Sequence, residues 1–371
     1  MASALFQPIQ LRSLTLENRI MISPMCQYSA VDGSADDWHM IHLGHLALGG
    51  AGILFVEATA VNPLGRITPG CLGLYSDANE AALKRIVDAV RANSDIPLGI
   101  QLAHAGRKGS SGTPWDGGTL ISIEEGGWIP VAPSAVPHSE GEPPPHALSR
   151  REFEAVTHAF AAATRRAERL GFDAIEIHAA HGYLLHEFLS PVSNFRGDEY
   201  GGPLENRMRL PLEVFTAMRS EWPKHKPMGV RVSATDWIDG GWDLAQAVVF
   251  AKALKKLGCD WIDASSGGIS PRQKIAPGPG YQVPFAEVIR RETGIATIAV
   301  GLITEPRQAE EIIASGKADM IALARGMLYD PRWAWHAAAE LGGEVRAPRQ
   351  YWRAEPRTAP SLFGRTKTGQ R

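Results

Sequence analysis

The chain has 371 residues, of which 44% are hydrophobic and 21% charged, and its formal net charge is −2. This composition allows a large core and excludes wholesale disorder, and the length suits one α/β barrel with insertions. A near-neutral chain without a basic run disfavours nucleic acid or an anionic membrane surface as the main partner.

No apolar stretch reaches the roughly 18 residues of a membrane-spanning helix. The first residues, MASALFQPIQLRSLTLENR, lack the charged-then-apolar pattern of a signal peptide. Cys26, Cys71 and Cys259 are far apart and form no CxxC pair, which disfavours a disulfide scaffold, a structural zinc site or an iron–sulfur cluster. We therefore expect a cytoplasmic enzyme.

Short apolar runs alternate with segments of helical period along most of the chain. They predict eight strands, at residues 19–24, 52–58, 97–103, 173–179, 227–233, 260–266, 296–301 and 319–324. Helical patterns lie between them, for example at 77–93 and 149–171. The second begins with a capping box, Ser149 followed three residues later by Glu152.

Continuously apolar strands that alternate with helices indicate a parallel sheet covered by helices. Eight such units predict a single-domain α/β protein over residues 1–371, folded as a closed (β/α)8 TIM barrel. An open doubly wound sheet is the alternative, although no GxGxxG motif follows any predicted strand.

Two segments break the strand–helix rhythm. Residues 104–148 are rich in glycine and proline and follow the third predicted strand, so we expect a lid-like excursion over the barrel mouth. Residues 342–371 are expected to form an irregular C-terminal tail with a loose basic end.

Polar residues stand where the predicted strands end, which is where TIM barrels place their chemistry. His178 and His181 follow the fourth strand together with Tyr183. By themselves the two histidines fit a metal site, a structural role, or contact with a substrate or cofactor. They lack the HExxH layout, and their place at the mouth favours donors that hold a substrate oxygen.

Arginine and glycine residues at other strand ends suggest a cofactor. Arg231 ends a strand that is otherwise apolar, and a buried guanidinium needs an anionic or electron-rich partner, such as the N1–C2=O edge of a flavin. Gly301 and Arg325 follow strands seven and eight, where barrels bind phosphate. Together these residues predict a phosphorylated cofactor across the barrel mouth.

At this point the chain resembles a known family. NRIMISPMCQY (18–28), NPLGRITPGCLGLYSD (62–77), IQLAHAGRK (100–108), HAAHGYLLHEFLSPVSNFRGDEYGGPLENR (178–207) and ALARGMLYDPRW (322–333) resemble motifs of the Old Yellow Enzyme family of FMN-dependent ene-reductases. The resemblance is to its thermophilic-like, xenobiotic reductase-like subclass. It covers nearly the whole chain.

The resemblance implies roles for individual positions. The flavin ring would lie along Ser23, Pro24, Met25 and Cys26, and Ala58 would contribute through its backbone. The pyrimidine side would meet Gln101 and Arg231, and the phosphate would meet Gly301, Ala324 and Arg325. His178 and His181 would bind the substrate oxygen, Tyr183 would donate a proton and Tyr28 would line the pocket. Arg353 would reach into a neighbouring protomer's site. No metal is expected.

Ala324 stands where many relatives have glycine, so the backbone there must avoid a conformation that only glycine adopts.

The implied activity is NAD(P)H-dependent reduction of activated C=C bonds. NADPH or NADH would give hydride to FMN, and an α,β-unsaturated carbonyl or nitro compound would then take its place. We expect a homodimer or homotetramer. Two alternatives remain: another FMN-barrel dehydrogenase or oxidase, and a flavin-binding protein without turnover.

Overall fold

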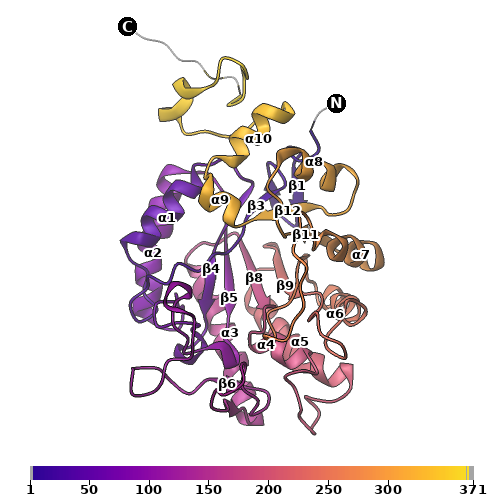
Figure 1. Ribbon diagram of the computed structural model, residues 1–371. Helices are drawn as coiled ribbons and strands as arrows, with labels where there is room; N and C mark the ends of the chain where they lie inside the picture. The colour runs from indigo at the N-terminus through magenta and orange to yellow at the C-terminus, as the bar shows by residue number, and fades with distance from the viewer. Residues whose placement is uncertain (1–2, 365, 367–371) are drawn as a thin grey trace.

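The computed structural model describes residues 3–364 and 366. Eight parallel strands close into a barrel, and helices surround it (Figure 1). Its strands are β3 (Ile20–Ile22), β4 (Ile53–Ala60), β5 (Leu98–Ala103), β8 (Ala174–Ala179), β9 (Met228–Ser233), β10 (Trp261–Ser265), β11 (Ala296–Ala299) and β12 (Met320–Leu323). All eight predicted strands and the (β/α)8 prediction are therefore confirmed.

The helices follow the strands in the alternation that the sequence predicts. They are α1 (Asp37–Ala47), α2 (Asp77–Asn93), α3 (Arg150–Arg169), α4 (Leu184–Leu189), α5 (Leu204–Glu221), α6 (Leu244–Lys256), α7 (Val283–Thr293), α8 (Pro306–Ala314), α9 (Arg325–Tyr329) and α10 (Trp333–Leu341). The predicted capping box of α3 is present, because Glu152 accepts a hydrogen bond from the backbone N–H of Ser149 at 2.7 Å.

A hairpin that the sequence did not predict closes the amino-terminal end of the barrel. Its strands, β1 (Ile9–Leu11) and β2 (Leu14–Leu16), are antiparallel and only three residues long. Leu11 and Leu16 are buried in one cluster with Met21, Ile53 and Trp261, which lie at or next to the first positions of β3, β4 and β10. The chemistry is thereby left to the opposite, carboxyl end.

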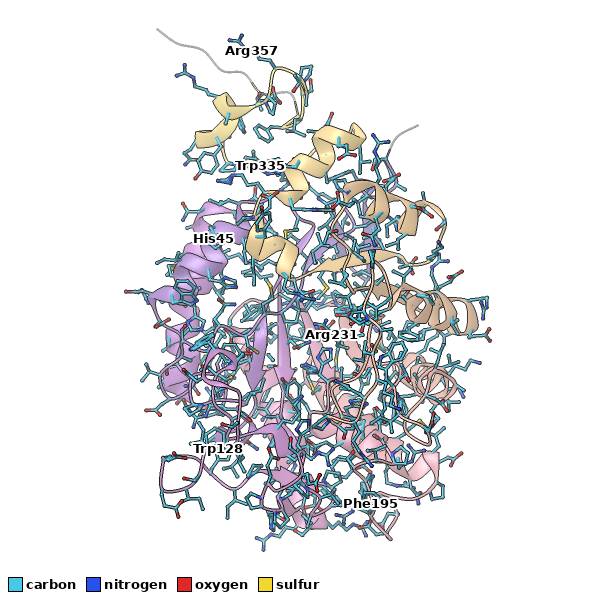
Figure 2. The ribbon with its side chains drawn as sticks, in the orientation of Figure 1. His45, Trp128, Phe195, Arg231, Trp335 and Arg357 are labelled. Carbon is cyan, nitrogen blue, oxygen red and sulfur yellow. The ribbon has the colours of Figure 1, made fainter. Side chains whose placement is uncertain are left out.

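The excursion at 104–148 contains short elements: η2 (Gly106–Lys108), η3 (Pro114–Asp116), and the paired strands β6 (Val131–Ala132) and β7 (His146–Ala147). It contacts loops at the carboxyl ends of several barrel strands. The Trp115 ring meets Tyr28 after β3, and Trp128, labelled in Figure 2, donates a hydrogen bond to the carbonyl of Leu64 after β4. Its role as a lid stays a prediction.

The C-terminal tail folds back on α10. It contains η4 (Arg349–Ala354), and the Phe363 ring packs at 4.7 Å from that of Trp335. Val345 donates a backbone hydrogen bond to Leu362 at 2.9 Å, and both residues are buried. The predicted irregular tail is therefore partly ordered, while most of its basic end lies outside the described residues. No described helix is long and apolar enough to cross a membrane.

Two glycines make room for aromatic rings inside the barrel. Trp261 and Phe55 pack edge to face with centroids 6.1 Å apart. A Cβ atom at Gly229 would lie 2.0 Å from the Trp261 ring, and one at Gly99 would lie 2.5 Å from the Phe55 ring. The interior has no space for even one more methyl group at these positions.

We expect Gly229→Ala to lower the free energy of unfolding by about 1–3 kcal/mol or more, because the added methyl group must displace a buried ring. Urea unfolding followed by circular dichroism would measure the change. Gly197→Ala is the matched control, since its Cβ atom would meet nothing within 4 Å. Equal stability of the two variants would contradict this account of the core.

Candidate active site

The barrel register brings the predicted site residues into neighbouring rows. His178 on β8 is the register partner of Arg231 on β9, which pairs in turn with Asp263 on β10. On the other side, a register shift in β4 at Glu57 sets Ala58 opposite Gln101 on β5. Residues that are far apart in the sequence therefore meet at one end of the barrel.

Two buried acids that the sequence analysis did not single out hold the cofactor candidates Gln101 and Arg231. Glu176 on β8 accepts hydrogen bonds from Gln101 Nε2 at 2.8 Å and from Trp261 Nε1 at 3.0 Å. Asp263 faces Arg231 Nε at 3.2 Å. An acidic residue inside an otherwise apolar strand was the signal that could have revealed both.

Burial determines the protonation of the two acids, Glu176 and Asp263. It raises the pKa of Glu176 to about 8, and the nearby charge of Asp263 adds to the effect. Burial also raises the pKa of Asp263, although Arg231 opposes it. At neutral pH Glu176 is therefore mostly protonated, and the arginine is balanced by a single carboxylate.

Hydrogen bonds assign the protons on the two histidines. The backbone N–H of Ala180 donates to His178 Nδ1 at 3.2 Å, so the ring proton of neutral His178 is on Nε2. That Nε2 lies 3.3 Å from His181 Nδ1, which accepts. His181 then carries its proton on Nε2 and donates to Ser265 Oγ at 2.7 Å. Each ring is a neutral donor with one N–H.

The pKa of both histidines lies well below its usual value. Burial is the larger cause, and the positive charge of Arg231 is the next. Each ring therefore stays neutral at pH 7 and can bind a substrate oxygen by hydrogen bonding rather than by ionic charge.

The loop that carries His181 is held by close backbone contact. His181 has a φ of +59°, a conformation that is costly for a residue with a side chain. Its N–H donates to Ser233 Oγ at 2.9 Å. A Cβ atom at Gly268, after β10, would lie only 2.5 Å from the His181 backbone, so only glycine lets the two loops meet there.

His186, the third histidine of this segment, has a structural partner. Its Nδ1 accepts from the N–H of Gly182 at 2.9 Å, and its Nε2 faces Asp236 Oδ1 at 2.9 Å. It therefore does not join His178 and His181. In the part of the chain that the structure describes, no group of three His, Cys, Asp or Glu residues is placed to hold a metal ion.

Tyr183 lies beside the histidine pair as the N-cap residue of α4. Its ring packs edge-on against that of His178, with centroids 4.8 Å apart. Burial raises the pKa of the phenol well above its usual value, so Tyr183 is protonated at neutral pH. The predicted donor and the predicted oxygen-binding pair are thus brought together.

The segment after β3 places Cys26 and Tyr28 at the same mouth, both half-buried. A hydrogen bond with Cys71, and then burial, raises the pKa of Cys26 well above its usual value, which keeps the thiol protonated. Burial likewise raises the pKa of Tyr28. Tyr28 has a φ of +56°, and its ring meets Trp115 with centroids 5.4 Å apart.

Three of the residues predicted to hold the flavin have hydrogen-bonding atoms that could bind it. The Ser23 hydroxyl is buried and has no hydrogen-bond partner among the described residues. Gln101 uses only Nε2 on Glu176, which leaves its carbonyl oxygen to accept. Arg231, near the centre of Figure 2, faces Asp263 through Nε, which leaves its Nη atoms to donate. This donor and acceptor set fits the polar edge of FMN.

The residues predicted to meet the phosphate follow two neighbouring strands, β11 and β12, and their role stays a prediction. Gly301, just after β11, has a φ of +125°, and a Cβ atom there would lie 2.8 Å from Gln282 Nε2. Arg325 begins α9 with an exposed side chain. Ala324 has a φ of −111°, which confirms that the backbone there avoids a glycine-only conformation.

Arg353 is not brought to this site within one chain. It lies in η4, beyond α10 at the top of Figure 1 and away from α4. Its predicted place in a neighbouring protomer stays a prediction.

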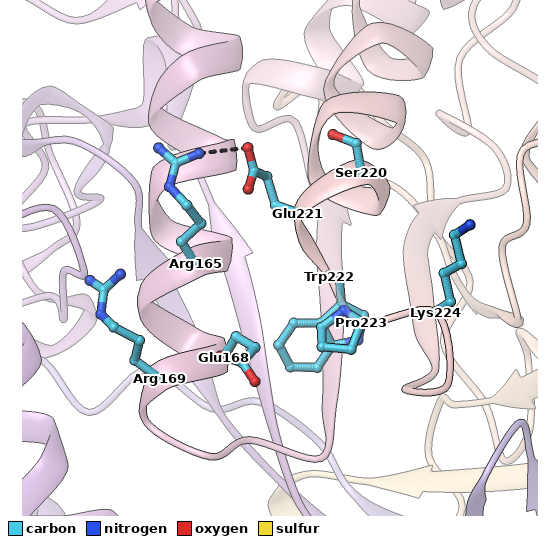
Figure 3. Close-up of a pocket in the computed structure, with 8 residues that line it drawn as sticks. All are labelled: Arg165, Glu168, Arg169, Ser220, Glu221, Trp222, Pro223 and Lys224. Carbon is cyan, nitrogen blue, oxygen red and sulfur yellow. Dashed lines mark hydrogen bonds and ion pairs between the residues drawn. The ribbon is translucent and has the colours of Figure 1, made fainter.

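The cavity in Figure 3 is a separate feature, of about 430 Å³. It lies between the last turns of α3 and α5, next to the residues that precede β9, and so at the amino-terminal end of the barrel. Arg165 is paired with Glu221 and Arg169 with Glu80. Because these charges are paired and the cavity lies at the amino-terminal end of the barrel, opposite the predicted site, we interpret it as a surface groove and not as part of the active site.

Comparison with known proteins shows which family the chain resembles. Residues 4–344 match the model of the NADH:flavin oxidoreductase / NADH oxidase family. The chain is 46% identical over 355 residues to an NADPH dehydrogenase of Geobacillus thermodenitrificans (strain NG80-2), covering 95% of this chain and 99% of the relative.

Two solved structures are similar in fold. Morphinone reductase is 28% identical with a TM-score of 0.77, over 99% of this chain and 94% of that one. A 2-naphthoyl-CoA reductase is 26% identical with a TM-score of 0.80, over 89% of this chain. The match spans about half, 51%, of the length of that larger protein.

The lowered histidine pKa values predict a stability that depends on pH. Burial lowers the pKa of His178 and His181 in the folded protein, so they stay neutral at a pH where the unfolded chain already protonates them with an ordinary pKa of about 6.5. At these two positions the unfolded state then binds more protons, so their contribution to the free energy of unfolding falls as the pH drops. The fall is up to about 1.4 kcal/mol per pH unit for each histidine. Glu176 and Glu187, whose pKa burial raises to about 8, contribute in the opposite direction, with or without the two histidines.

Urea unfolding at pH 7 and pH 5 would show a smaller fall for the double variant His178→Asn, His181→Asn than for the unchanged protein. Part of the fall remains, because burial also lowers the pKa values of His42, His104 and His138 to about 4. The two proteins are compared by their change with pH, since the substitutions also alter packing. An equal change in both would contradict the assignment of neutral rings.

Proposed function

This chain belongs to the NADH:flavin oxidoreductase / NADH oxidase family, and from that premise we propose that it reduces activated C=C bonds of α,β-unsaturated carbonyl or nitro compounds. It is an oxidoreductase that uses FMN and a nicotinamide donor, NADPH or NADH. The observation that carries the proposal is the loop that joins two neutral imidazole donors to a protonated tyrosine, with the two donor rings 5.0 Å apart and the tyrosine 4.8 Å from the first.

The side chains of the barrel would position FMN and provide polar contacts to it. FMN, when bound, supplies the hydride that it takes from the nicotinamide. Gln101 and Arg231 would hold its pyrimidine edge, and Gly301, Ala324 and Arg325 its phosphate. Ser23, Pro24, Met25 and Cys26 would lie along its ring, and Ala58 would contribute through its backbone.

His178 and His181 would bind the activating oxygen of the substrate, and Tyr28 would line the pocket. Because each ring carries its proton on Nε2, a substrate oxygen would compete with the present contacts to His181 Nδ1 and Ser265 Oγ. Negative charge grows on that oxygen as hydride arrives at the β-carbon. Donors already in place and shielded from water stabilise this charge more than water does.

Tyr183 would supply the proton. Its raised pKa makes it a weak acid, so it can protonate only a carbon that has become strongly basic. The α-carbon becomes basic once hydride has added at the β-carbon. A tyrosine is therefore suited to act after hydride transfer and not before it.

We expect Tyr183→Phe to slow alkene reduction about 100-fold or more, the scale of one general acid, and to spare reduction of the flavin by NADPH. Anaerobic stopped-flow absorbance would follow bleaching with NADPH and recolouring with cyclohexenone as separate steps. Tyr200→Phe is the control, because that hydroxyl contacts Glu213 at 3.2 Å, away from the site. Equal slowing of both steps in Tyr183→Phe would contradict its role, and a protein that bleaches but never recolours would contradict the proposed function.

We also propose that the protein is a homodimer or homotetramer in which Arg353 reaches the substrate pocket of a neighbouring protomer. Support comes from exposed apolar side chains on α1 and α9, where Trp38 is 50%, Ile41 61% and Tyr329 94% exposed. Such residues normally avoid water and are enriched where proteins associate.

Coexpression of Arg353→Ala and Tyr183→Phe chains tests this arrangement. Each variant alone should reduce enones slowly. In a mixed dimer one site would carry both changes and the other neither, so purified heterodimers should regain up to about half of the normal rate per dimer. No recovery, or a monomer in sedimentation analysis, would contradict the proposal.

A further inference from the structure

Lys108 is a titratable residue at the mouth that the mechanism above does not use. It is the last residue of η2, and its ammonium donates to the carbonyl of His181 at 2.9 Å and to that of Gly268 at 3.2 Å. The same atom lies 5.0 Å from the centre of the Tyr183 ring. One cation therefore touches both loops of the site and the proton donor.

We propose that Lys108 is the positioning residue of the proton-transfer step: it fixes the loop of His181 and Tyr183, and its charge stabilises the negative oxygen that Tyr183 carries after giving up its proton. This inference rests on the proposed function.

The turn around Lys108 is built to hold it in place. Gly106 has a φ of +62°, and a Cβ atom there would lie 2.1 Å from Glu187 Oε1, so only glycine lets the turn approach α4. The backbone N–H of Arg107 donates to the same Glu187 oxygen at 2.8 Å, and Arg107 Nη2 donates to the carbonyl of Ile269 at 2.6 Å. The turn thus ties α4 to the loop after β10.

The titratable groups around Lys108 are Glu187 from α4, Arg107 from its own turn, His138 from the excursion, and the neutral His178 and His181 from the β8 loop. Burial lowers the pKa of Lys108 to about 8, with Glu187 opposing the shift. Burial raises the pKa of Glu187 to about 8 as well.

In the proposed step the O–H bond of Tyr183 breaks and a C–H bond forms at the α-carbon, whose electron pair takes the proton. Tyr183 is left as a phenolate until water returns a proton to it. A positive charge above the ring lowers the energy of that phenolate and of the transition state leading to it. A neutral lysine would keep the hydrogen bonds to the two carbonyls but would lose this electrostatic effect.

A pH profile distinguishes the electrostatic effect of Lys108 from its hydrogen bonds to the two loops. As the pH rises through about 8, Lys108 loses its proton, and the rate of alkene reduction should fall while flavin reduction by NADPH does not follow it. Two full unit charges 5.0 Å apart, at an effective dielectric constant of about 20, correspond to roughly 200- to 300-fold. Because the phenolate charge is only partly developed in the transition state, we expect a loss of roughly 10- to 100-fold in rate.

The experiment compares Lys108→Met and Lys108→Arg holoenzymes with the unchanged protein by anaerobic stopped flow from pH 6 to pH 10. We expect Lys108→Met to reduce cyclohexenone 10- to 100-fold more slowly at pH 7 and to lose the fall near pH 8. Lys108→Arg should recover most of the rate, also without that fall, because arginine stays charged. A larger solvent deuterium isotope effect in Lys108→Met would mark proton transfer as the affected step.

Lys226→Met is the matched control, since Lys226 lies 5.0 Å above the Trp222 ring and donates to the carbonyl of Phe172, at the other end of the barrel. It should change neither half-reaction. Glu187→Gln distinguishes the two groups that titrate together: it should keep the fall and move it to lower pH, because the carboxylate no longer supports the lysine charge.

Three results would overturn the inference: a normal rate of alkene reduction in Lys108→Met, a fall near pH 8 that persists in Lys108→Met but vanishes in Glu187→Gln, or equal slowing of both half-reactions at full FMN content. Failure of the proposed function looks different, because then even the unchanged protein would bleach with NADPH and never recolour with cyclohexenone. Normal behaviour of Lys108→Met beside a slow Tyr183→Phe would overturn this inference alone.

Discussion

The site depends on keeping one arginine charge inside a closed barrel. Arg231 points from β9 into an interior where an isolated cation would be far too costly, and Asp263 on the neighbouring strand balances it at 3.2 Å. A second acid, Glu176, lies close by, and burial raises its pKa to about 8, so it remains mostly neutral and serves as a hydrogen-bond partner for Gln101. The same arginine charge helps to keep His178 and His181 neutral. Cofactor binding and substrate binding therefore share one electrostatic arrangement.

Close backbone packing above that interior fixes the reactive loop. His181 adopts a φ of +59° because Gly268 lets the loop after β10 lie directly against it, and Lys108 bonds to carbonyls of both loops. Strain of this kind persists only where several contacts oppose its release. The rigid mouth holds two hydrogen-bond donors and one proton donor in place before any substrate arrives.

Much of the fold could be predicted because its pattern is local. Eight continuously apolar strands, each followed by a helix, leave the TIM barrel as the leading architecture, and the capping box of α3 marks its start within the sequence itself. The β1–β2 hairpin was missed because two three-residue strands carry too little periodicity to be recognised. The order in the tail was missed for a related reason, since it comes from contacts between Phe363 and Trp335 and between segments of the tail.

The sequence by itself determined which chemical groups are present at the strand ends: two histidines and a tyrosine on one loop, an arginine in an apolar strand, and a glycine and an arginine after the last two strands. Only the tertiary structure decided how they are charged and oriented. The proton on each histidine depends on a hydrogen bond to a backbone N–H or to a residue on another strand, and the neutrality of Glu176 depends on burial beside Asp263. Lys108 meets Tyr183 only because β5 and β8 are neighbours in the barrel. Apart from the contacts of His178 with Ala180 and His181 in its own loop, these are interactions between segments distant in sequence. Their strength follows from the exclusion of water that closure of the barrel creates.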